Sequence, residues 1–326
     1  MNRPDVSVII VAHNRAELVP VVLSHLERQT FPAARYEAVV VDNASSDGTL
    51  ETVLRYACGA PVCIRAVRNE GGGENAARNL GAREAAGRWL LFLDDDVLPG
   101  PALIEAHVFA QEQHAGKACV HGVVVPHPRI RHGVLTRWFL PENRMDPSGE
   151  NVAFYEWFAE NLGMPRSLYL ESGGLAEDQP SPRFAAIELL LRLREAGVEV
   201  VCEPRAQAFL WCAVKLEEER RRCYFQGRAL YHLSTRGDAQ PMLRHYHLAR
   251  LHLRNLRDRL FIPFYLRSCQ DREEDTYAYG SLYRRILRYE RWLGYRDALQ
   301  SRPPAWEVAP GRNATRAARG ARHSVL

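Results

Sequence analysis

The sequence predicts an α/β protein with an open, doubly wound, mostly parallel sheet and a helical C-terminal extension. Over the first 125 residues, short apolar runs alternate with segments of helical spacing, the pattern of a parallel sheet with helices on both faces. From Leu216 to about residue 296 the spacing is helical only. The chain has 326 residues and is 46% apolar, which is sufficient for a sizeable core in one large or two modest domains.

The expected elements of the first half follow one another closely. The strands are continuous apolar runs, as in strands buried on both faces, and cover residues 6–11, 37–41, 62–67, 89–93 and 117–125. Helices are expected over 18–26, 49–58 and 74–86, with another opened by Pro99-Gly100-Pro101. Helix 49–58 follows Ser45-Ser46-Asp47-Gly48, whose side-chain oxygens can cap its first turn.

The alternation of strands and helices stops over residues 126–170, which are rich in proline and aromatic residues. We therefore expect loops, or a hairpin, that cover the carboxyl edge of the sheet, where ligands of open α/β sheets bind. A helix follows over 185–196, with Gly197 as its C-cap, and then short strands over 198–202 and 206–210. The chain is therefore divided into three parts. These are an α/β domain over 1–212, with halves 1–125 and 126–212, a basic helical extension over 213–300 and a disordered tail over 301–326.

The net charge of +4 gives no reason to expect nucleic acid, but the charge is unevenly distributed. Residues 1–214 carry 20 basic and 27 acidic side chains, whereas residues 215–326 carry 23 and 12. The acidic part suits a metal, and the basic part suits phosphate or an anionic membrane. Within residues 244–267, an apolar stripe runs beside a row of arginines, so this helix could lie on a membrane surface. The alternative is a helix that packs on the domain and exposes its arginines to water.

Cysteine usage and hydropathy bear on the compartment. The seven cysteines form no CxxC pair, which argues against a zinc knuckle and for reduced thiols in a cytoplasmic protein. The apolar run over residues 6–12 is too short for a signal peptide, and no run reaches the roughly 18 residues of a spanning helix. We expect a cytoplasmic protein, or one peripheral to the inner face of the membrane.

The strand over Trp89–Leu93 runs directly into Asp94–Asp96. Each close pair of like charges repels by roughly 1 kcal/mol even in water, so three adjacent carboxylates favour a bound cation. Oxygen ligands suit a hard divalent ion, Mg²⁺ or Mn²⁺, and Asp94 and Asp96 lie on the same side of an extended segment. The alternative is a solvated acidic turn.

Four motifs resemble those of family-2 glycosyltransferases with the GT-A fold, in the family's order, over residues 5–125. They are the first strand leading into Ala12-His13-Asn14-Arg15, then Asp42 to Thr49, then Asn69 to Gly73 with Ala77 to Gly81, and Asp94–Asp96 in place of the family's DxD. Downstream, segments over 164–175, 189–197 and 215–231 are similar to the acceptor-side segment, the helix after it and an Arg-rich helix. Gly71 to Ala76 also mimics a dinucleotide-binding fingerprint, but that motif belongs after the first strand.

The resemblance implies a metal-dependent, inverting transfer of a sugar from a nucleoside-diphosphate sugar to an acceptor, which is a saccharide, a lipid-linked group or a small molecule. A divalent cation, Mg²⁺ or Mn²⁺, would neutralise the leaving diphosphate. The resemblance assigns Asp94 and Asp96 to the metal. It assigns these residues to the donor: Ala12, Asn14, Asp42, Asn69, Arg78, Asp94 and Asp95.

The sequence departs from the family where a catalytic base is expected. Alignment on residues 187–193 places Ala185-Ala186 at the position of the family's acidic pair, and alanine cannot accept a proton. Ala176 stands where an aspartate is common, and Phe209-Leu210-Trp211 lacks the family's histidine. Glu188, one helical turn from Ala185, is the first candidate base, and Glu177 and Asp178 in the preceding loop are the alternatives. The alternative is a catalytically silent GT-A domain that serves as a binding or scaffold subunit.

Overall fold

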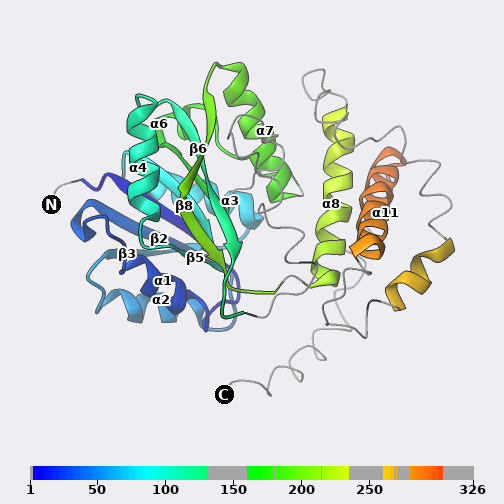
Figure 1. The fold of residues 1–326 in the computed structure, drawn as a ribbon, viewed down its shortest axis with the longest axis horizontal. Coiled ribbons are helices and arrows are strands. Elements are labelled where there is room, and N and C mark those ends of the chain that lie inside the picture. Colours follow the sequence, from blue (N-terminus) through cyan, green and yellow to red (C-terminus); the bar gives the residue numbers. More distant parts are fainter. Residues whose placement is uncertain are drawn as a thin grey trace.

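The computed structural model describes residues 3–130, 135, 160–179, 181–213, 215–234, 260–267, 269 and 280–303. Within these residues, eight strands form one sheet in the order β3-β2-β1-β4-β7-β6-β8-β5. Helices cover both faces of this sheet, and two further long helices stand side by side at its edge (Figure 1). The α/β class and the helical C-terminal part are as the sequence predicts.

The first four strands of the chain are parallel and form one half of the sheet. They are β1 (Val6–Ala12), β2 (Tyr36–Asn43), β3 (Cys63–Asn69) and β4 (Trp89–Asp94). The register pairs Ala12 with Asp42, Asp42 with Arg68, and Val11 with Asp94. The ends of β1, β2 and β4, which carry predicted donor residues, therefore lie at one edge of the sheet. Ligands of open α/β sheets bind at this edge.

The helices pack their apolar sides onto the two faces. Helices α1 (Val19–Leu26), α2 (Thr49–Ala57) and α4 (Leu103–Gln113) contribute to one core cluster. Helices α3 (Gly73–Glu84), α6 (Arg166–Glu171) and α7 (Pro182–Glu195) contribute to the other. A one-turn 3-10 helix, η1 (Ala33–Arg35), precedes β2. Side chains alternate along β1, so that Val8 and Ile10 face the first cluster and Ile9 faces the second.

The second half of the sheet is mixed, and here the sequence prediction is partly wrong. Strand β7 (Asn161–Pro165) lies antiparallel between β4 and β6 (Ala118–Pro126), where only loops or a hairpin were predicted. The two predicted short strands are one strand, β8 (Glu199–Leu210), which pairs with β6 across a register irregularity near Gly122. A three-residue strand, β5 (Val97–Pro99), pairs with the end of β8. Glycine and proline in β7 concealed its strand character.

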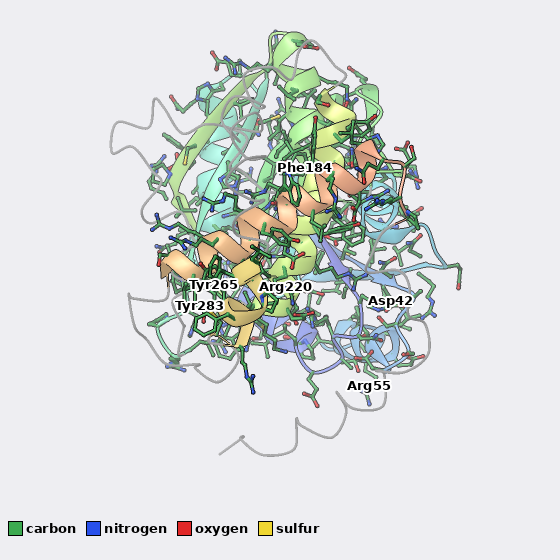
Figure 2. The ribbon with its side chains drawn as sticks, turned by 90° about the vertical axis from the view of Figure 1, so that its right-hand side faces the viewer. Asp42, Arg55, Phe184, Arg220, Tyr265 and Tyr283 are labelled. Carbon is green, nitrogen blue, oxygen red and sulfur yellow. The ribbon has the colours of Figure 1, made fainter. Side chains whose placement is uncertain are left out.

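Beyond the sheet, α8 (Leu216–Ser234) and α11 (Gly280–Leu299) form a tightly packed pair. A Cβ atom added to Gly227 would overlap the carbonyl oxygen of Arg291, so the two backbones meet directly there. Arg220 of α8 donates to Glu290 of α11 at 2.6 Å, and Tyr265 packs with Tyr283 at one end of the pair (Figure 2).

No helix among the described residues is both long and apolar enough to cross a bilayer. Most of the basic segment over 244–267 lies outside the described residues, and residues 260–267 are helical. Within this short helix, Ile262 and Tyr265 are buried against α11, whereas Leu260, Phe261 and Phe264 are exposed.

Candidate functional site

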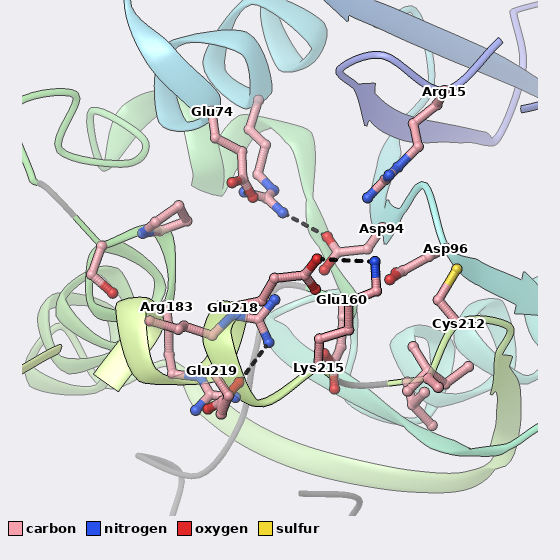
Figure 3. A pocket seen from close by; sticks show the side chains of 17 residues that line it. Arg15, Glu74, Asp94, Asp96, Glu160, Arg183, Cys212, Lys215, Glu218 and Glu219 are labelled. Atoms are coloured by element: carbon pink, nitrogen blue, oxygen red, sulfur yellow. Dashed lines mark hydrogen bonds and ion pairs between the residues drawn. The ribbon is translucent and has the colours of Figure 1, made fainter. Parts of the chain in front are cut away.

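A cavity of about 420 Å³ opens at the carboxyl edge of the sheet, between β4 and the first turns of α8 (Figure 3). This volume suits a small-molecule ligand. Among the described residues, its acidic lining consists of Glu74, Asp94, Asp96, Glu160, Glu218 and Glu219. Its basic lining consists of Arg15, Arg78, Arg183, Lys215 and Arg222. A cavity with both charges suits a ligand that carries phosphate together with a cation.

The acidic triplet at the end of β4 is divided between different partners. The Asp94 carboxylate accepts a hydrogen bond from Arg78 at 2.6 Å, and the Asp95 carboxylate pairs with Arg15 at 3.2 Å. The Asp96 carboxylate lines the cavity and forms no ion pair within the described part of the chain. Burial, and then the Asp96 carboxylate, raises the pKa of Asp95 to about 7. Burial, and then Asp94, raises the pKa of Asp96 to about 6.

These raised pKa values show that negative charge has gathered where water screens it poorly, a condition that a divalent cation would relieve. Asp94 and Asp96 supply the hard oxygen ligands that Mg²⁺ and Mn²⁺ take. No group of three or more metal-binding side chains occurs among the residues described. A cation held by two carboxylates would take its other ligands from water and a diphosphate, as Mg²⁺ commonly does. The donor set fits such an ion.

Arg78 is buried on α3 and binds two carboxylates, those of Glu74 and Asp94. Burial opposes its positive charge, but these two carboxylates outweigh that cost and raise the pKa of Arg78. Helix α3 begins just after Gly72, whose φ of +99° is in the left-handed region, where glycine carries no steric cost. The glycine-rich segment thus places Arg78 against the end of β4.

The other predicted donor residues lie at the same sheet edge but do not line the cavity. Ala12 ends β1 and is buried, and Asp42 pairs with Arg68 at 2.7 Å while its Oδ1 atom is buried without a hydrogen-bond partner. The Asn14 Oδ1 atom accepts from the Ser46 amide at 2.9 Å. In a separate contact, the Asn69 side-chain amide donates to the Asn43 Oδ1 atom at 2.7 Å. The two asparagines fasten the loops around Asp42.

Glu188, the predicted base, does not line the cavity. Its Oε1 atom accepts from Arg192 at 2.8 Å, and Arg192 also donates to the Gly174 carbonyl oxygen at 2.7 Å. Glu188 therefore joins α7 to the turn after α6, and this position gives no support to a catalytic role. Ala185 and Ala186 are buried in the core, so α7 offers no carboxylate at the positions where the family carries its acidic pair.

Several cavity residues were missed by the sequence analysis. Glu160 belonged to a segment interpreted as loop. It immediately precedes β7, and its side chain lines the cavity. Burial, and then the Asp94 carboxylate, raises the pKa of Glu160 to about 7. Arg222 lies on α8, is 55% exposed and pairs with Glu219 at 3.1 Å. The resemblance of residues 215–231 to an Arg-rich helix was the one signal that pointed to this side of the cavity.

Residues 7–160 match the model of the family described as "Glycosyl transferase family 2". The chain is 30% identical over 226 residues to the validoxylamine A glucosyltransferase of Streptomyces hygroscopicus subsp. jinggangensis, covering 60% of this chain and 52% of that protein. It is 38% identical over 105 residues to the glycosyltransferase AglE of Haloferax volcanii, covering 32% and 34%. The chain thus spans about a third to a half of the length of these relatives.

Two solved structures share the fold. The mannosyltransferase PcManGT from Pyrobaculum calidifontis, in complex with GDP-Man and Mn²⁺, superposes with a TM-score of 0.63 and 19% identity, covering 93% of this chain and 89% of that one. The structure of S. aureus TarS 1-349 with UDP gives a TM-score of 0.56 and 16% identity, covering 91% and 92%. At these identities, the similarity establishes the fold.

Proposed function

Since the chain belongs to glycosyl transferase family 2 and has the GT-A fold, we propose that it transfers a sugar from a nucleoside-diphosphate sugar to an acceptor. The observation that carries this proposal is the acidic triplet at the end of β4, at the edge of a cavity that also presents arginines. The two structural neighbours are complexes with a nucleotide or a nucleotide sugar, which supports a donor of this class.

Asp94 and Asp96 would hold a divalent cation, Mg²⁺ or Mn²⁺, which would neutralise the charge that develops on the diphosphate when it leaves. The cation in the neighbour from Pyrobaculum calidifontis is Mn²⁺. The chain's own cations supplement this charge: Arg15 and Arg222 both line the cavity, and a guanidinium can bind phosphate oxygens bidentately.

The nucleoside would lie beside the cavity, over the ends of β1 and β2. The buried Oδ1 atom of Asp42 lacks a hydrogen-bond partner, and a base N–H or a ribose hydroxyl would satisfy it. Asn14 and Asn69 hold the surrounding loops in place. We propose direct displacement at the anomeric carbon, which inverts its configuration, because one face of the sugar would be occupied by the leaving diphosphate.

A second candidate function is a catalytically silent domain that binds a donor without turnover. The specific observation in its favour is that Ala185 and Ala186 are packed in the core and Glu188 is bound by Arg192. A silent domain keeps the metal and donor groups but has no group that accepts the acceptor's proton.

The experiment that tests the proposed function is calorimetric titration with UDP-glucose, UDP-GlcNAc and GDP-mannose, with and without Mn²⁺, combined with a measurement of nucleoside diphosphate release. We expect at least one donor to bind only with Mn²⁺, and the Asp96→Ala variant to lose that binding. Glu51→Ala, on the exposed side of α2, is the control. Metal-independent binding, or unchanged binding by Asp96→Ala, would contradict the proposal, whereas binding without release would favour the silent domain.

We also propose that the helix over 260–267 contacts the inner face of a membrane. Leu260, Phe261 and Phe264 are 80%, 50% and 67% exposed, and large apolar side chains gathered on one surface mark interaction sites. Residues 215–326 carry an excess of positive charge, which an anionic lipid surface complements.

A further inference from the structure

The cavity contains one carboxylate without an assigned role. Among the six acidic side chains of its described lining, four form ion pairs with neighbouring cations: Glu74 and Asp94 with Arg78, Glu218 with Lys215, and Glu219 with Arg222. Asp96 is the proposed metal ligand. The remaining one, Glu160, forms no hydrogen bond or ion pair with any residue that the structure describes. A carboxylate that lines such a site and has no partner among the described residues is available to a ligand.

The position of Glu160 is fixed by the sheet. Strand β7 runs antiparallel to β4 with Asn161 opposite Leu93, so Glu160 lies beside the end of β4 from which Asp94 projects. Asn161 is fully buried and anchored on two sides: its Nδ2 atom donates to the Ala206 carbonyl oxygen at 2.9 Å, and its Oδ1 atom is 2.8 Å from His107 Nε2. The backbone that follows Glu160 is therefore anchored next to the donor and metal residues.

We propose that Glu160 is the general base of the transfer, in place of the acidic pair that α7 lacks. This inference rests on the proposed function. The acceptor hydroxyl gives its proton to the Glu160 carboxylate while its oxygen bonds to the anomeric carbon. The bond from that carbon to the diphosphate oxygen breaks, and its electron pair leaves with the nucleoside diphosphate. Two charged arginines, Arg183 and Arg222, face Glu160 across the cavity and favour the ionised carboxylate that this step needs.

The test compares the reactions of two small nucleophiles, water and azide, catalysed by the full-length protein. It uses Mn²⁺ and whichever nucleotide sugar binds in the calorimetric titrations. Water must lose a proton when it attacks the anomeric carbon, whereas azide carries none and needs no base. We expect Glu160→Gln to lower nucleoside diphosphate release in water by about 100- to 10,000-fold, the usual contribution of a general base. Formation of glycosyl azide should stay close to that of the unaltered chain. Glu171→Gln, an exposed carboxylate on α6, is the inert control.

The outcomes separate the alternatives. Equal loss of both reactions in Glu160→Gln would show that Glu160 holds the donor or metal and would overturn the inference. Unchanged hydrolysis in Glu160→Gln, with selective loss of hydrolysis in Glu188→Gln, would assign the base to Glu188. If the unaltered chain binds a donor with Mn²⁺ but releases no diphosphate, donor binding stands and the base assignment fails. If it binds no donor, the proposed function itself fails.

Discussion

The contribution of His107 to the stability of the protein should be lost in mild acid, because this histidine is buried in a site that accepts only its neutral form. The Nε2 atom lies 2.8 Å from Asn161 Oδ1, and the Nδ1 atom has no hydrogen-bond partner. A Cβ atom added to Gly163 would meet Nδ1 at 2.7 Å, so Gly163 lets the ring lie against the β7 backbone. A proton on Nδ1 would place a charge there without an acceptor. Burial accordingly lowers the pKa of His107 from its ordinary 6.5 to about 4.

The sign of the effect follows from proton linkage. Between pH 6.5 and 4 the unfolded chain protonates this histidine and the folded chain does not, so acid favours unfolding. The contribution is fully present above pH 6.5 and is lost as the pH falls towards 4. The two pKa values differ by about 2.5, and at about 1.4 kcal/mol per pKa unit the full loss is roughly 3.5 kcal/mol. That is a large part of the stability of a typical domain.

The measurement is urea unfolding of the unaltered chain and of His107→Gln at several pH values between 7.5 and 4.5, without donor or metal. Asp95, Asp96 and Glu160 have raised pKa values and act in the opposite direction, but they are common to both proteins. The difference in unfolding free energy between the two proteins therefore isolates His107, and it should shrink as the pH falls. His114→Gln, at the end of the same helix, is the control. A difference that stays constant with pH would show that the pKa of His107 is the same in the folded and unfolded protein.

Two further predictions concern the C-terminal helices. Gly227→Ala should destabilise the protein by about 1–3 kcal/mol in urea unfolding, because overpacking forces α8 and α11 apart, whereas Gly59→Ala has open space around it and should not. Sedimentation with vesicles containing phosphatidylserine at low salt should be lost on joint replacement of Leu260 and Phe264 by serine. Replacement of Leu54, an exposed residue of α2, by serine should leave sedimentation intact. Sedimentation that survives the joint replacement of Leu260 and Phe264 would contradict membrane contact through residues 260–267.

The parallel half of the sheet was predictable from the sequence because its signals are local. Strand β4 is apolar from Trp89 to Leu93 and ends in carboxylates, so the residues that form the strand also show where it stops. The register then places Asp42 and Asp94 at one edge without further information. The neighbouring glycine-rich motif marked Arg78 as a candidate donor residue, and the contact of Arg78 with Asp94 is seen only in the structure. For these residues, a position at the end of a parallel strand is enough to predict which residues lie close together in space.

The other half of the site depends on contacts that no local pattern records. Strand β7 contains Gly163 and ends in Pro165, both of which argue against a strand. It is stable in the sheet because it is paired on both sides and because Gly163 admits the ring of His107. Once β7 lies beside β4, Glu160 faces the acidic triplet although 64 residues separate it from Asp96 in the chain. The antiparallel pairing of β7 with β4, which the sequence did not predict, therefore brings Glu160 to the site. Helix α7 has only Ala185 and Ala186 where the family carries its acidic pair.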